Sequence, residues 1–157
     1  MKKVISCLIV VIPVVFLLLS ACSNGGSPEE QVRRYIKAGE EAAEARDVTI
    51  IKKLIAEKYS DDHGRTRRDL VAITARYFFT NKNIHIFSRI GELVFPEENR
   101  ARLQLFVAMT GQNVSDLDAL LNMRADLYRF DMDLALEDKE WKLISAEWRQ
   151  AGPEDFF

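Results

Sequence analysis

His85 is the side chain whose type and position best suit acid–base chemistry. It lies between Ile84 and Ile86 in an apolar stretch, so in an extended strand its side chain faces away from both isoleucines. A neutral imidazole could accept a proton there, because histidine titrates near neutral pH. The alternative, which we favour, is a structural histidine with satisfied hydrogen bonds. No complete catalytic set accompanies His85, so the sequence favours a protein that is not an enzyme.

Asp131 and Asp133 are the other carboxylates on a predicted strand. They alternate with Tyr128, Phe130 and Met132, and alternate residues of a strand point to opposite faces of the sheet. We expect the apolar set to meet the interior and both aspartates to lie in solvent. There they would pair with arginine or lysine side chains across neighbouring strands.

The run Asp61, Asp62 and His63 offers two carboxylates and an imidazole, which are groups that metal ions accept. Adjacent residues rarely converge on one ion, and the sequence has no second histidine or cysteine cluster to complete a shell. We therefore predict no metal and no cofactor. We interpret the run as a loop that caps the next helix, with an aspartate available to pair with arginine 65, 67 or 68.

The amino terminus has the pattern of an export signal. Lysines at positions 2 and 3 precede an apolar stretch over residues 4–19, as in secretory signal peptides. The stretch is shorter than the roughly 20 residues that span a bilayer, and it contains Pro13. The sequence Leu-Ser-Ala-Cys at 19–22 resembles the lipobox of bacterial lipoproteins. That resemblance implies cleavage after residue 21 and a lipid on the thiol of Cys22.

Lipidation would determine where the mature chain resides. Acyl chains hold a protein on a bilayer, and Ser23 in place of aspartate favours the outer membrane in the lipoproteins that this one resembles. We expect the domain on the periplasmic face of that membrane. Cys7 lies in the removed segment, so the mature chain cannot form an internal disulfide. Removing residues 1–21 shifts the formal net charge from −2 to −4, which argues against nucleic acid as a partner.

Helical patterns occupy the first half of the remaining chain. Ser27, Pro28 and Glu30 form a cap, a first-turn proline and a capping box for a helix that reaches about Arg46. Asp47 can cap a second helix. A third ends near Asn81, and its apolar face consists of Leu70, Ile73, Thr74, Tyr77 and Phe78.

Strand patterns occupy the second half. We expect strands at 84–95, 100–109, 124–137 and 141–149, with turns at 96–99 and 138–139. In the last strand, Trp141 and Leu143 should face one side and Ile144 and Trp148 the other, which gives the outer face an apolar patch. A short helical insert at 115–122 should pack on the core, or alternatively act as a lid.

This order of elements, ending in Trp-Lys-Leu-Ile-Ser-Ala-Glu-Trp, resembles the nuclear transport factor 2-like, or SnoaL-like, superfamily over about residues 28–150. The best local match is Tyr59 to Leu70. The resemblance implies an α+β fold in which three N-terminal helices pack on a curved antiparallel sheet of about four strands and form a cone with a pocket. The chain then divides into a signal peptide (1–21), a lipidated tether (22–27), the domain (28–150) and a C-terminal tail (151–157).

Members of that superfamily use the pocket differently, so the fold leaves function open. Some place an aspartate or histidine base and tyrosines in it, which makes Tyr59, Asp62, His85 and Tyr128 candidates for a ligand site. Three hypotheses follow. The leading one is an anchored lipoprotein whose cone binds a small apolar ligand or a protein partner. The others are an isomerase- or hydrolase-type enzyme that uses His85, and a homodimeric interaction module that pairs through the apolar outer face of the last strand.

Overall fold

A computed structural model describes residues 26–111 and 126–156 of this chain. Helices α2 (Pro28–Glu44), α3 (Val48–Leu54) and α4 (Arg67–Thr80) precede strands β1 (His85–Glu97), β2 (Arg100–Thr110), β3 (Asp126–Glu137) and β4 (Glu140–Gln150), and a 3-10 turn, η1 (Pro153–Phe156), follows. The predicted signal peptide, Cys22 and the insert at 115–122 lie outside the described residues. None of the described helices is long and apolar enough to cross a bilayer.

The first two helices begin at the predicted caps. The side chain of Ser27 accepts a hydrogen bond from the Glu30 N–H (3.2 Å), and Glu30 Oε2 accepts one from the Ser27 N–H (2.8 Å). This reciprocal pair satisfies two of the amide groups that a helix N-terminus leaves without partners. Asp47 caps α3 by accepting from the N–H groups of Thr49 and Ile50.

Helix α4 differs from the expectation in its cap and its exposed face. Its N-cap is Thr66, and Asp69 accepts from the Thr66 N–H (2.9 Å) and hydroxyl (2.7 Å), so neither Asp61 nor Asp62 caps the helix. Phe78 is buried, as expected, but Ile73 is 44% exposed and lies off the apolar face predicted for it.

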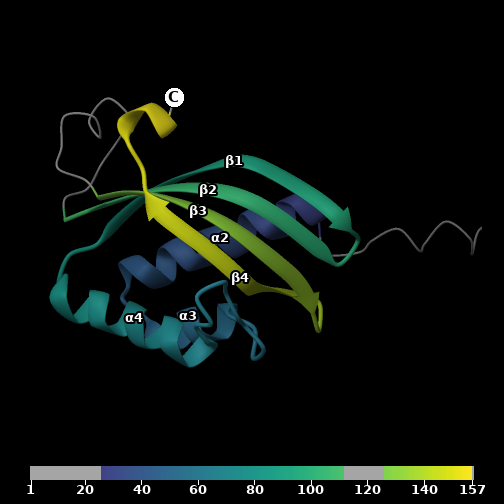
Figure 1. Ribbon diagram of the computed structural model, residues 1–157, viewed down its shortest axis with the longest axis horizontal. Coiled ribbons are helices and arrows are strands. Elements are labelled where there is room, and N and C mark those ends of the chain that lie inside the picture. Colours follow the sequence, from purple (N-terminus) through teal and green to yellow (C-terminus); the bar gives the residue numbers. More distant parts are fainter. Residues whose placement is uncertain (1–25, 112–125, 157) are drawn as a thin grey trace, which may run out of the picture.

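The four strands form one antiparallel sheet in the order β1-β2-β3-β4, and all three helices lie against one face of it (Figure 1). Asp138 and Lys139 both have positive φ and make the tight turn between β3 and β4. Pro96 lies within β1 and not in the turn where we expected it. It fits there because β1 is an edge strand, and proline has no N–H to give to a ladder.

The core lies between the helices and the sheet. The predicted alternation in β2 is confirmed, since Ala101, Leu103, Leu105 and Val107 are all buried in this core. Phe106 and Ala108 point to the opposite face, where a second cluster packs around them with Phe87, Leu127 and Ala151.

The predicted face of Trp148 is wrong. A bulge separates the pair Asp133–Ser145 from the pair Leu134–Leu143, and Ile144 is the residue left between them. Such an insertion shifts the alternation by one residue. Trp148 therefore pairs with Phe130 on the helix side of the sheet, and the outer apolar patch expected on β4 loses its largest member.

Groups at both edges of the sheet find partners outside it. At the β1 edge, Glu44 of α2 accepts a hydrogen bond from the Ile86 N–H at 2.9 Å. At the β4 edge, the N–H groups of Ala56 and Ser60 donate to the carbonyl groups of Leu143 (2.9 Å) and Ile144 (3.2 Å). These contacts fix α2 and the loop after α3 against opposite edges of the sheet.

Candidate functional site

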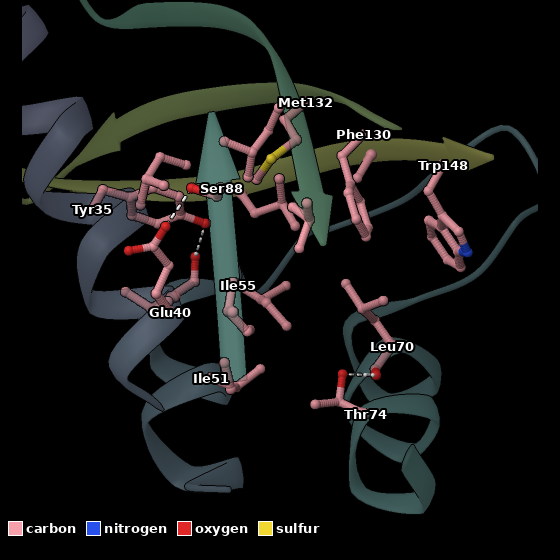
Figure 2. A pocket seen from close by; sticks show the side chains of 18 of the residues that line it. Tyr35, Glu40, Ile51, Ile55, Leu70, Thr74, Ser88, Phe130, Met132 and Trp148 are labelled. Atoms are coloured by element: carbon pink, nitrogen blue, oxygen red, sulfur yellow. Dashed lines mark hydrogen bonds between the residues drawn. The ribbon is translucent and has the colours of Figure 1, made fainter. Parts of the chain in front are cut away.

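An apolar cavity of about 230 Å³ lies between the helices and the sheet (Figure 2). Helix α2 contributes Tyr35 and Glu40, α4 contributes Leu70 and Thr74, and the sheet supplies the opposite wall. Most lining side chains are aliphatic or aromatic. The sheet wall consists of Ile86, Ser88, Leu105, Val107, Met109, Phe130, Met132, Leu143, Ala146 and Trp148.

Two polar groups in the wall are already bound to backbone. The hydroxyl of Tyr35 donates to the carbonyl of Leu54 at 3.2 Å, and the hydroxyl of Thr74 donates to the carbonyl of Leu70 at 3.0 Å. Burial raises the pKa of Tyr35 well above its usual value, so the phenol stays protonated. Both hydroxyl protons are thus engaged, and this part of the wall presents carbon to a ligand.

Glu40 and Ser88 form the polar margin of the cavity. The Ser88 hydroxyl donates to Glu40 Oε1, which joins α2 to β1. Both residues also line a shallow groove outside, together with Arg33, Lys37 and Arg89. The pair therefore lies between the apolar cavity and the groove that residues of α2 and β1 line outside it.

Tyr59 is buried near this site without lining the cavity. Its hydroxyl donates to Asp61 Oδ2 at 3.1 Å, with the carbonyl of Ala146 3.5 Å away. Burial and then the neighbouring charge of Asp61 raise the pKa of Tyr59 to about 12. At neutral pH Tyr59 is thus a hydrogen-bond donor that holds the 59–66 loop.

Asp61 is the centre of that loop. Its carboxylate accepts from the N–H groups of His63 and Arg65, both at 3.0 Å, and from Arg65 Nε at 2.7 Å. Burial alone would raise the pKa of Asp61, but the hydrogen bonds from Arg65, Tyr59 and His63 outweigh it and hold the pKa below its usual range. The predicted pairing of an aspartate with Arg65 is confirmed.

His85 and Tyr128 do not line the apolar cavity. His85 begins β1 opposite Thr110 and alternates with the inward-facing Ile86, so it points to the outer face as expected. The ring of Tyr128 lies 6.2 Å from that of Phe130 at the edge of the sheet wall. The structure thus does not bring His85, Tyr59 and Tyr128 together around the cavity.

Asp62 is exposed and reaches the outer face of the sheet. Its carboxyl lies close to that of Glu147 on β4. A hydrogen bond between the two carboxyl groups, and then the negative charge of Asp62, raise the pKa of Glu147. Asp131 and Asp133 lie on the same face, as predicted. Asp133 pairs across strands with Arg102 (3.0 Å), and Asp131 pairs along its own strand with Arg129 (2.9 Å).

Sequence reasoning missed Tyr35, Glu40, Ser88 and Trp148 as parts of the cavity wall. A signal for Glu40 was present, because it follows the apolar Ile36 by four residues and so lies on the same face of the helix. Trp148 carried no such signal, since its position depends on the bulge in β4.

The described residues have the nuclear transport factor 2-like, or cystatin-like, fold. A protein from Novosphingobium aromaticivorans, provisionally named a scytalone dehydratase, superposes with a TM-score of 0.64 at 12% identity, over 79% of this chain and 84% of that one. A cystatin-like domain of unknown function from Nostoc punctiforme gives 0.59 at 14% identity, over 82% of each chain.

An NTF-2-like protein of unknown function from Silicibacter pomeroyi gives a TM-score of 0.57 at 12% identity, over 78% of this chain and 95% of that one. No protein-family model and no curated protein matches the sequence. At these identities the likeness establishes the fold, and the fold hosts several functions.

Proposed function

We propose that this chain is a cell-envelope lipoprotein, anchored through an acylated Cys22, whose cone binds a small apolar molecule without transforming it. The observation that carries the binding function is the cavity of about 230 Å³ with a largely apolar wall. Ligand sites are typically concave and apolar with a few polar groups. The cavity exceeds the ~150 Å³ that holds benzene and falls below the ~300 Å³ where drug-sized sites begin.

The polar groups of the wall favour binding over catalysis. Tyr35 and Thr74 donate to backbone carbonyls, and Ser88 donates to Glu40. A general base must lie within reach of the proton that it removes, and His85 does not line the cavity. A ligand would therefore meet an apolar wall with one carboxylate at its margin.

The anchor rests on the sequence at 19–22 and on the short segment between Cys22 and α2. That segment, Ser-Asn-Gly-Gly-Ser at 23–27, has the composition of a flexible linker. A domain attached in this way would stand close to the bilayer surface.

Extraction of the 23–157 polypeptide tests the binding function. The described core lies between Val32 and Ala146, so this polypeptide contains it. We expect mass spectrometry of an organic extract to identify one apolar molecule in stoichiometric amount. Leu70→Trp fills the cavity and should abolish its retention, whereas Ile73→Trp, on the exposed side of the same helix, should not. Equal retention by both variants would contradict the proposal.

A further inference from the structure

A basic groove of about 900 Å³ lies beside the N-terminal half of α2, α3 and the turn between β3 and β4. We call it the basic groove. Four cationic side chains and one carboxylate line it, so its formal charge is positive. The charged members are Arg34, Lys53, Lys139, Lys142 and Glu140.

The floor of the basic groove is apolar and aromatic. Tyr35, Ile50, Leu54 and Leu136 line it with Trp141, which is only 5% exposed. The indole Nε1 of Trp141 is buried and has no hydrogen-bond partner. Lys142 is held at the wall, where its Nζ donates to the carbonyl of Lys53 at 2.9 Å. Lysine and arginine above an aromatic, apolar floor are typical of a surface that meets a lipid headgroup region.

The chain enters the domain at the rim of this groove. The side chain of Gln31, which lines the groove, donates to the carbonyl of Gly26 at 3.1 Å. A Cβ atom on Gly26 would lie 3.1 Å from the guanidinium of Arg34. Cys22 precedes Gly26 by four residues, and four extended residues reach about 14 Å. A lipid on Cys22 would therefore keep the groove close to the bilayer surface.

We propose that the basic groove docks on the phosphate headgroups of anionic phospholipids in the membrane that carries the acylated Cys22. This inference rests on the proposed anchoring. Attraction between a basic surface and an anionic bilayer fades over a Debye length of about 8 Å at physiological ionic strength. The short tether keeps the groove near that range. The β1–β2 turn, the β3–β4 turn and the start of α2 lie at one end of the domain (Figure 1), and docking would turn this end toward the membrane.

Hydrogen exchange of the acylated mature protein tests this docking. The protein is reconstituted in vesicles of phosphatidylcholine alone or of phosphatidylcholine mixed with phosphatidylglycerol. The anchor holds it on both, so exchange reports docking and not recruitment. We expect amides over 50–54 and 136–142 to exchange more slowly on the anionic vesicles, by about tenfold if the docked state is nine-tenths populated. High salt should remove the protection.

Charge variants connect the protection to the groove. The double variant Lys53→Glu and Lys139→Glu should abolish the protection, and the same pair changed to Gln should reduce it. Both lysines are exposed, so the fold should persist. The control is Lys82→Glu, which makes one such charge reversal in the exposed segment between α4 and β1, at the opposite end of the sheet from the β3–β4 turn (Figure 1).

Each failure has its own signature. Mass spectrometry of the mature protein comes first, and a Cys22 without acyl chains would overturn both the anchoring and the docking. Acylated protein with equal exchange on both vesicle types would overturn the docking alone. If inorganic phosphate gave the same protection on phosphatidylcholine vesicles, the groove would bind a soluble anion and the membrane assignment would be wrong.

Discussion

The guanidinium carbon of Arg65 lies 3.9 Å from the ring centroid of Trp148. The same side chain donates from Nε to the buried carboxylate of Asp61 at 2.7 Å. On the sheet, the ring of Trp148 stacks with that of Phe130 at 6.2 Å, and both rings line the cavity. Arg65 thus joins the 59–66 loop to the aromatic wall of the cavity.

Arg65→Ala should destabilise the domain strongly. It removes the cation beside a carboxylate whose side chain has no exposed surface, and a buried charge without its partner costs more than the pair contributed. Arg65→Lys should restore only part of the stability, because an ammonium group lacks the planar shape that stacks on an indole. Urea unfolding measures both variants. Arg68→Ala, which removes an exposed arginine at the start of α4, is the control and should change little.

The hydrogen bonds to Asp61 predict a specific acid dependence. Its pKa is lowered in the folded state, so below the ordinary carboxyl value of about 4 the unfolded chain binds more protons than the folded one. The stability that the ionised Asp61 confers is therefore present above that value and is lost as the pH falls through the folded-state pKa. The difference in unfolding free energy between the wild type and Asp61→Asn should shrink over this acidic range. A difference that stays constant with pH would contradict the assignment.

Ionisation of Glu147 should have the opposite effect on the unfolding free energy from that of Asp61. Its pKa is raised by the shared hydrogen bond and the charge of Asp62, so the folded state favours the protonated form and ionisation weakens the fold. Glu147→Gln should raise the unfolding free energy at neutral pH and have little effect in acid, where Glu147 is already protonated. Asp62→Asn should reproduce the gain. A gain for Glu147→Gln that is the same at both pH values would exclude the repulsion as its cause.

Substitutions on the two faces of β3 should differ in how much they lower the free energy of unfolding. Phe130→Ala removes a partly buried ring from the cavity wall and should cost about 3 kcal/mol, at the lower end of the range for large aromatic truncations. Asp131→Ala, one residue along on the solvated face, should change stability by about 0.5 kcal/mol or less. Comparable losses at the two positions, measured by denaturant unfolding, would argue against the described register.

Cys22→Ser should abolish acylation, since Cys22 is the only cysteine left after removal of residues 1–21. The variant should accumulate as an unprocessed precursor or be released from membranes. Labelling with a fatty acid precursor and cell fractionation measure the two effects. Cys7→Ser, within the proposed signal peptide, is the matched control and should be labelled normally. If Cys22→Ser incorporated the fatty acid label at the level of the wild type, the lipoprotein assignment would be refuted.

Local patterns predicted most of the fold. The caps at Ser27 and Asp47 were predictable because they depend on residues three or fewer positions away. The inward faces of β2 and β3 follow from alternation alone. Thr66 and Asp69 have the same three-residue spacing as Ser27 and Glu30, so this cap too was within reach of the sequence.

The site was harder to predict because it depends on pairing between distant residues. Ile144 is displaced by a bulge that exists only in the register of β4 against β3, and this reverses the face of Trp148. Glu40 has a charged side chain that suggests a solvent position, yet its partner is Ser88, 48 residues away. The spacing of Glu40 from Ile36 places it on the same face of the helix, but no local pattern encodes its contact with Ser88 or the displacement of Ile144.

The contacts at the two sheet edges affect how this protein could meet its neighbours. A chain confined to a membrane surface encounters other copies and other proteins at high local concentration, where exposed strand edges promote aggregation by strand addition. Here Glu44 occupies the Ile86 N–H, and Ala56 and Ser60 occupy the carbonyl groups of Leu143 and Ile144. An incoming strand would have to displace α2 at Ile86, or the 55–60 segment at residues 143 and 144, before it could pair there. Strand addition at these two places would therefore require a local rearrangement of the helix or the loop first, which lowers the risk of assembly into extended sheets there.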